Sequence, residues 1–89
     1  MVQKPFDFGI ALRLLKTGER VARSGWNGKG MHLEYVAATE WATSSTEQPG
    51  STDLKPLPWI GMKTADGCFV PWLASQTDLL AEDWVGVVL

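Results

Sequence analysis

Two dipeptides that favour tight turns, Asn27-Gly28 and Asp66-Gly67, each lie between two short runs of strand-forming residues. In a type I′ turn both central residues have positive φ, which asparagine, aspartate and glycine adopt at little cost. Each dipeptide therefore predicts an antiparallel hairpin, and the chain is expected to fold around an antiparallel sheet. The four strands predicted in this way are 21–26, 31–37, 59–64 and 68–73.

Apolar residues at helical spacing predict a helix near the N-terminus, over residues 7–16. Asp7 is suited to cap its start, and Gly18 is suited to end it. A helix with one apolar side needs a surface to pack on, so we expect it to cover one face of the sheet. The apolar stripe of this helix comprises Phe8, Ala11, Leu12 and Leu15, widened by Ile10 and Leu14.

Near the C-terminus, Ser75 and Asp78 have the spacing of a capping box, in which two side chains bond backbone N–H groups reciprocally. The pattern predicts a short helix that ends near Ala81, followed by an apolar strand over 84–89. We therefore expect an α+β fold, with an N-terminal helix packed on a mostly antiparallel five-strand sheet and a short C-terminal helix. The whole chain, 1–89, is expected to form one domain.

Composition and charge argue against several classes of protein. The chain has 45% hydrophobic and 20% charged residues, as ordinary globular proteins do. No stretch approaches the roughly 18 consecutive apolar residues that a membrane span needs. A net charge of -2 argues against binding to duplex nucleic acid through a broad basic face. One cysteine, Cys68, cannot form an internal disulfide; it is expected to be a small buried residue, and a reducing cytoplasm is the expected compartment.

A polar segment, residues 39–58, separates the two predicted hairpins and is rich in Ser, Thr, Gly and Pro. A loop of this length inside a compact domain is usually functional or disordered. It contains one tryptophan, Trp41, which is interpreted either as a lid over a ligand or as a residue without a functional role.

Three of the five tryptophans lie within residues 57–84, among short polar side chains. Such a mixture suits a small planar, polar ligand better than a core. We expect Trp26 and Trp72 to contact ligand, whereas Trp59 and Trp84 are equally well explained by structural roles. A base stacked on an aromatic ring gains about 1–3 kcal/mol, so tight binding also needs hydrogen bonds in an enclosed pocket, which subunits of a small protein can share. Donors to an anionic ligand would come from Arg23, Lys29, Lys63 or the Thr64 hydroxyl.

No pattern makes a positive case for catalysis, a metal or a cofactor. The single histidine, His32, is expected to be a partly exposed strand residue. The carboxylates that could form an acid–base pair are explained by a turn, a helix cap and a solvated helix end; they are Asp66, Asp78, Glu82 and Asp83. A small nucleotide hydrolase using Asp66, Asp78 or Asp83 is the catalytic alternative, and a ligand-free assembly module is the structural one.

Several segments resemble the small phage proteins of the second Thoeris anti-defence family, once catalogued as a domain of unknown function. They are FDFGIALRLLKTGERVAR at 6–23, GWNGKG at 25–30, PWIGMKTADG at 58–67 and PWLASQTDLLAEDW at 71–84. The joint occurrence of the last three, in this order and at this spacing, is far more specific than any one of them. The resemblance covers nearly the whole chain apart from the central loop.

The resemblance implies a homotetramer that is not an enzyme and acts in the cytoplasm of the infected bacterial host. Such a protein would sequester a cyclic ADP-ribose isomer (glycocyclic ADP-ribose) made by bacterial TIR-domain sensors, and would thereby block Thoeris anti-phage defence. Some relatives are also thought to hold cyclic dinucleotides at a separate site; no nucleic acid polymer or membrane is expected as a partner. The ligand contacts implied in this chain are Trp26, Asn27, Trp59, Met62, Lys63, Thr64, Trp72, Ser75, Gln76, Thr77 and Asp78.

Individual roles within this set follow from the chemistry of each side chain. The carboxylate of Asp78 is expected to accept hydrogen bonds from ribose hydroxyls or an exocyclic amine. The donor to the pyrophosphate would be Lys63 or Thr64. The ring that stacks on adenine would be that of Trp26, Trp59 or Trp72.

Overall fold

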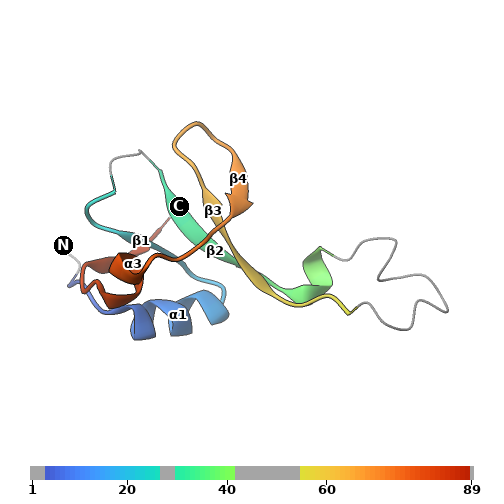
Figure 1. Cartoon of the computed structure of the whole chain (residues 1–89), viewed down its shortest axis with the longest axis horizontal. Helices are drawn as coiled ribbons and strands as arrows, with labels where there is room; N and C mark the ends of the chain where they lie inside the picture. The colour runs from blue at the N-terminus through green and yellow to red at the C-terminus, as the bar shows by residue number, and fades with distance from the viewer. Residues whose placement is uncertain (1–3, 27–29, 42–54, 89) are drawn as a thin grey trace.

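A computed structural model describes residues 4–26, 30–41 and 55–88 (Figure 1). None of the helices in these ranges has the length and apolar character needed to cross a membrane. The elements in chain order are α1 (Phe8–Lys16), β1 (Arg20–Arg23), β2 (His32–Val36), the 3-10 helix η1 (Ala38–Glu40), β3 (Trp59–Lys63), β4 (Phe69–Pro71), α3 (Gln76–Leu80) and β5 (Trp84–Val87).

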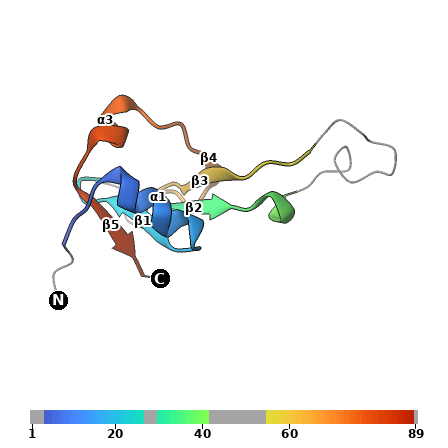
Figure 2. The same cartoon turned by 90° about the horizontal axis from the view of Figure 1, so that it is seen from below.

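The five strands form one antiparallel sheet in the order β4-β3-β2-β1-β5. The predicted hairpins β1–β2 and β3–β4 are joined by the pairing of β2 with β3, and β5 returns to pair with β1. Figures 1 and 2 show α1 beside the β1 and β5 end of the sheet, with α3 next to it, while β2 and β3 extend away towards η1. The predicted α+β class, five-strand sheet and two helices are confirmed.

Helix α1 begins where the sequence predicts because Asp7 caps it: Asp7 Oδ1 accepts a hydrogen bond from the backbone N–H of Ile10 at 3.0 Å. A cap of this type stabilises a helix by about 1 kcal/mol. The helix ends just before Gly18, which has a φ of 95° that other residues rarely adopt. Ala11 and Leu15 are fully buried. Ile10 was expected in the apolar stripe but is 37% exposed, because it lies about 100° around the helix from Ala11.

The core lies between α1 and the sheet, and Trp84 is its largest fully buried side chain. A structural role for Trp84 is therefore established. The other members of the fully buried cluster are Ala11, Leu15, Val21 and Leu33. Half-buried side chains surround them and extend the core along the same face of the sheet, namely Phe6, Phe8, Leu14, Trp26, Tyr35, Ile60, Met62, Trp72 and Ala81.

The connection between β1 and β2 is longer than the tight turn that the sequence predicts. Strand β1 ends at Arg23 instead of residue 26, because the chain turns there and the Trp26 N–H donates back to the Arg23 carbonyl at 3.1 Å. Strand β2 begins at His32. The turn dipeptide at 27–28 lies outside the described residues. The antiparallel pairing of the two strands is present as predicted.

The β3–β4 hairpin closes around the turn predicted at Asp66 and Gly67. Thr64 N–H donates to the Cys68 carbonyl at 2.8 Å, and Gly67, with a φ of 88°, donates to the Thr64 carbonyl at 3.1 Å. Cys68 is exposed, so the expectation of a buried thiol was wrong. The reason is its position, since it precedes β4 at the tip of the hairpin instead of lying within the strand.

Residues 39–41 and 55–58 of the segment predicted as a polar loop are described by the structure. The first residues of the segment form η1, in which Glu40 Oε1 accepts a hydrogen bond from Ala37 N–H at 2.9 Å. Trp41 follows, and its indole N–H donates to the Leu57 carbonyl at 2.7 Å. This bond joins the described residues before and after 42–54.

Candidate ligand-binding site

The candidate residues lie on both sides of the sheet. In β3, Trp59, Gly61 and Lys63 point to one side while Ile60 and Met62 point to the other, because successive strand residues alternate. Ile60 and Met62 pack against the core, so their side is the one that α1 covers; we call it the helix face. Trp59, Gly61 and Lys63 belong to the opposite side, which we call the open face.

On the helix face, Trp26 and Trp72 both pack edge-on against the buried Trp84. The ring centroids of Trp26 and Trp84 are 5.6 Å apart at 78°, and those of Trp72 and Trp84 are 6.0 Å apart at 86°. The ring centroid of Phe8 lies 5.2 Å from that of Trp84 and 5.9 Å from that of Trp72. Such aromatic pairs contribute about 0.5–1.5 kcal/mol beyond their buried area. Trp26 and Trp72 are thus half-buried supports of the core whose remaining surface faces solvent.

The capping box predicted at Ser75 and Asp78 is present at the start of α3. Asp78 N–H donates to Ser75 Oγ at 3.1 Å, and Ser75 N–H donates to Asp78 Oδ2 at the same distance. The Ser75 hydroxyl also donates to Asp78 Oδ2 at 2.9 Å. Both side chains of the box are therefore engaged within the protein. Gln76 and Thr77, in the turn between them, are exposed.

Arg23 at the end of β1 holds two carboxylates from different segments. Its Nε donates to Asp83 Oδ1 at 2.9 Å, and its Nη1 donates to Asp78 Oδ1 at 3.0 Å. Its hydrogen bonds to Asp83 and then to Asp78 raise the pKa of the guanidinium. The hydrogen bond that Arg23 Nε donates to Asp83 lowers the pKa of the Asp83 carboxyl. Asp83 was expected to be solvated at a helix end. It instead accepts a hydrogen bond from Arg23, which lies 60 positions away in the chain.

For Asp78, opposing effects act on the carboxyl pKa. Burial favours the neutral form and would raise the pKa, but hydrogen bonds from Ser75 and Arg23 together outweigh burial and leave it lowered. The carboxylate of Asp78 therefore stays ionised at neutral pH while both of its oxygens accept hydrogen bonds within the protein.

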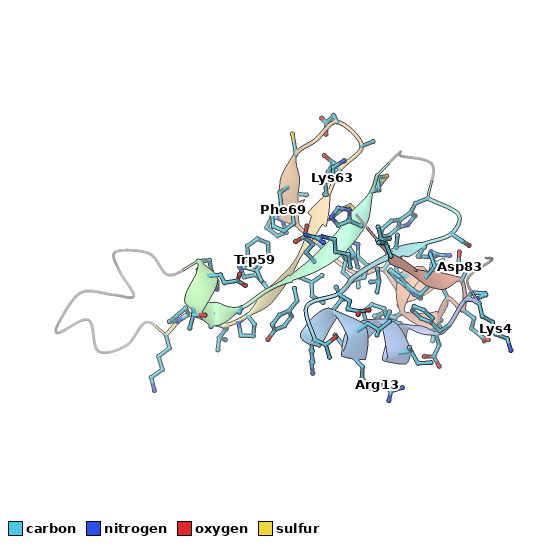
Figure 3. All side chains as sticks on the ribbon, turned by 180° about the vertical axis from the view of Figure 1, so that it is seen from behind. Lys4, Arg13, Trp59, Lys63, Phe69 and Asp83 are labelled. Atoms are coloured by element: carbon cyan, nitrogen blue, oxygen red, sulfur yellow. The ribbon has the colours of Figure 1, made fainter. Side chains whose placement is uncertain are left out.

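The open face carries an aromatic pair, Trp59 and Phe69, with ring centroids 5.8 Å apart (Figure 3). The Phe69 ring lies over Gly61, where an added Cβ would come within 2.2 Å of Phe69 Cζ. A glycine inside a strand is a signal for such a close approach. The sequence reasoning missed Phe69 because it did not use that signal.

A charged cluster lies beside this pair, where the strand register places His32 opposite Lys63 and Glu34 opposite Gly61. His32 Nδ1 is 2.9 Å from the Gly30 carbonyl oxygen and Nε2 is 2.9 Å from Glu34 Oε2. The hydrogen bond with His32 lowers the pKa of Glu34. His32 is only 2% exposed, so the expectation of a partly exposed histidine was wrong. These two polar partners allow the ring to be buried.

Lys63 and Thr64, the predicted donors to pyrophosphate, sit at the end of β3. Lys63 Nζ lies 3.4 Å from the Thr64 carbonyl, and a Cβ on Gly30 would approach Nζ to 3.0 Å. The Thr64 hydroxyl bonds to Asp66 and accepts from Cys68 N–H at 3.0 Å. Hydrogen bonding from Thr64 lowers the pKa of Asp66. The Thr64 hydroxyl therefore makes its hydrogen bonds within the turn between β3 and β4.

The structure brings one group of the predicted residues together around Trp84 and α3, and leaves another on the open face. Asn27 lies outside the described residues. Among residues 4–26, 30–41 and 55–88 there is no group of three or more His, Cys, Asp or Glu side chains that could hold a metal ion. The group around Trp84 comprises Trp26, Trp72, Ser75 and Asp78, with Met62 on the same face of the sheet, whereas Trp59 and Lys63 lie on the open face.

Comparison with known proteins covers both groups. Residues 6–87 match the family described as the Thoeris anti-defense 2-like domain. The chain belongs to this family. A curated relative, named Thoeris anti-defense 2, from Bacillus phage SP01, is 44% identical over 80 residues, which span 88% of this chain and 90% of the relative. The resemblance seen in the sequence motifs is confirmed, and the family match includes every candidate contact.

Proposed function

We propose that this chain counteracts Thoeris defence by binding and sequestering a cyclic ADP-ribose isomer (glycocyclic ADP-ribose), made by TIR-domain sensors, without cleaving it. The observation that carries the proposal is its membership of the Thoeris anti-defense 2-like family, with 44% identity to a phage protein of that name. The proposed place of action is the cytoplasm of the infected bacterial host.

The half-buried tryptophans support a planar ligand. Trp26 and Trp72 are held at near right angles to Trp84, so their rings are fixed before any ligand arrives. A fixed ring loses little conformational entropy when a base stacks on it, which favours affinity. The exposed polar side chains of Gln76 and Thr77 lie in the same segment as Trp72 and are suited to hydrogen bond with ribose or base edges.

The state of the carboxylates favours binding over hydrolysis. A general acid needs a raised pKa, but Asp66, Asp78 and Asp83 all have lowered pKa values because hydrogen bonds stabilise their ionised forms. Each has its oxygens engaged by Thr64, Ser75 or Arg23 within the protein. The hydrolase alternative therefore gains no support from the geometry.

The distribution of candidate residues over two faces supports a site shared between copies of the chain. The backbone of the sheet lies between Trp59 and Lys63 on the open face and the residues around Trp84 on the helix face, so a small ligand that rests on one face is separated from the other. If Trp59 and Lys63 contact the same ligand as Trp72, they must come from a second copy. A homotetramer, the proposed assembly, provides such junctions and covers exposed apolar side chains such as Leu73 and Leu80.

Incubation of the purified protein with the cyclic ADP-ribose isomer, followed by heat denaturation, tests this function. We expect the protein to deplete the ligand from solution and heating to return it intact, in proportion to protein. Cyclic dinucleotides are tested in the same assay as second candidate ligands, because the family resemblance implies them. Product in excess of protein would show turnover and defeat the proposal, and failure to deplete the ligand would defeat it equally.

A further inference from the structure

Helix α3 depends on bonds from outside its own sequence. It has only five residues, Gln76–Leu80, and isolated helices shorter than about 12 residues are marginal in water. Its position relative to the sheet is therefore set by what anchors it. Two anchors reach it: Trp84 Nε1, from β5 just after the helix, donates to the Asp78 carbonyl at 3.0 Å, and Arg23 Nη1, from the distant strand β1, donates to the Asp78 carboxylate at 3.0 Å.

The second anchor is rigid because Arg23 is itself held. Its Nε bonds to Asp83, and Ser24 N–H donates to the Asp83 carbonyl at 2.9 Å. The Arg23 side chain is 22% exposed and the Asp78 side chain 16% exposed, so the pair is partly shielded from water and weakly screened. A planar guanidinium that donates from two nitrogens fixes orientation as well as charge.

Both groups are engaged inside the protein, where the guanidinium uses two of its five N–H donors. Arg23 points two of its donors at carboxylates, and Asp78 accepts on Oδ1 from Arg23 and on Oδ2 from Ser75. A ligand phosphate that bonded Arg23 through these donors would have to displace a carboxylate. A ribose hydroxyl that bonded Asp78 would compete with Ser75 and Arg23.

We infer that Arg23 is a positioning residue for the ligand-binding segment from Trp72 to Asp78, and that it acts through Asp78 without contacting the ligand. This inference rests on the proposed function and changes two expected roles within it. Arg23 is assigned to Asp78 and Asp83 in place of a ligand phosphate, and Asp78 becomes the link between Arg23 and α3. The exposed Gln76 and Thr77 are then the polar groups of this segment that meet the ligand.

A double-mutant cycle with the cyclic ADP-ribose isomer as probe tests the inference. If Arg23 acts through Asp78, R23Q and D78N each weaken binding by about tenfold, and the double variant by about tenfold rather than about a hundredfold. R13Q is the matched control, because Arg13 lies on the exposed side of α1 and the charge change is the same; it should bind as wild type does. Losses that multiply in the double variant would overturn the inference.

The pH profile of binding gives a readout that a loss of packing alone would not change. Because Arg23 helps to lower the pKa of Asp78, its removal lets Asp78 protonate at higher pH. In R23Q the loss of affinity on acidification should begin at higher pH than in wild type, and in D78N that shift should be absent. An Arg23 that bonds the ligand directly would instead lower affinity at every pH without moving the acid limb.

R23K serves where R23Q does not fold, because lysine keeps the charge but cannot donate from two nitrogens in a fixed plane. It should weaken binding nearly as much as R23Q; wild-type affinity in R23K would contradict the inference. If wild-type protein itself fails to bind the probe, the proposed function falls and this inference falls with it. If instead the wild-type protein binds the probe normally and the losses multiply in the double variant, only the positioning role of Arg23 is overturned.

Discussion

The indole N–H of Trp84 donates a hydrogen bond to the backbone carbonyl of Asp78 at 3.0 Å, joining the largest side chain of the core to the last candidate contact in the chain. Trp84 also packs edge-on against the rings of Trp26 and Trp72. The core and the helix-face candidate site therefore share one residue, so changes in either are expected to affect the other.

Replacement of Trp84 by phenylalanine should destabilise the fold by about 2–6 kcal/mol. The change removes buried volume and leaves the Asp78 carbonyl without its donor, and each effect costs about 1–3 kcal/mol. Urea denaturation measures the loss. W41F is the matched control, since Trp41 bonds the Leu57 carbonyl at an exposed site, and it should change the unfolding free energy by less than about 1 kcal/mol. Equal midpoints for W84F and wild type would contradict the account.

Substitution of Gly61 by alanine should displace the Phe69 ring, because the new methyl group would meet it at 2.2 Å. The loss of the contact between Phe69 and Trp59 is expected to cost about 1 kcal/mol. In an F69A background the same substitution should cost nothing, since the space over Gly61 is then empty. Urea midpoints of the four proteins give the coupling, and an equal cost of G61A in both backgrounds would refute the proposed steric cause.

The unfolding free energy should fall on acidification, in part through Glu34. Its folded pKa is below the ordinary 4.5, chiefly because of the hydrogen bond with His32. A lowered carboxyl pKa adds stability that is complete above the unfolded pKa and is lost as pH falls through the folded one. We expect E34Q to flatten the decline of the urea midpoint between about pH 5 and about pH 3. A decline as steep in E34Q as in wild type would exclude this role for Glu34.

Removal of the Trp72 ring should weaken ligand binding without changing assembly. A lost stack costs about 1–3 kcal/mol of binding free energy, which isothermal titration of W72A with the cyclic ADP-ribose isomer would measure. Gel filtration should give the elution volume of wild type. W41A is the control, because Trp41 bonds the Leu57 carbonyl far along the chain from α3. Wild-type affinity in W72A would remove Trp72 from the site.

Features that depend on neighbouring residues could be predicted from the sequence. The cap at Asp7 and the box at Ser75 and Asp78 involve partners three residues apart, so spacing alone identifies them. The Asp66-Gly67 turn is equally local. These signals, with strand alternation, were enough to give the α+β class and the two antiparallel hairpins.

Features that depend on distant partners could not be predicted in this way. Strand β1 ends early beside the bond between Arg23 and Asp83, two residues that are 60 positions apart. The burial of His32 depends on the position of β2 between β1 and β3, while bonds to the nearby Gly30 and Glu34 satisfy its ring nitrogens. The sequence motifs named the candidate contacts, but the packing of Ile60 and Met62 against the core was needed to show which face of the sheet each contact occupies.

The central claim is that copies of the chain together hold an intact nucleotide signal, and native mass spectrometry tests it most directly. Wild-type protein mixed with the cyclic ADP-ribose isomer should appear as a tetramer whose added mass equals that of the unmodified ligand. W72A should give the same tetramer with less ligand bound. A monomer that retains the ligand, or a bound mass increased by one water, would contradict the account.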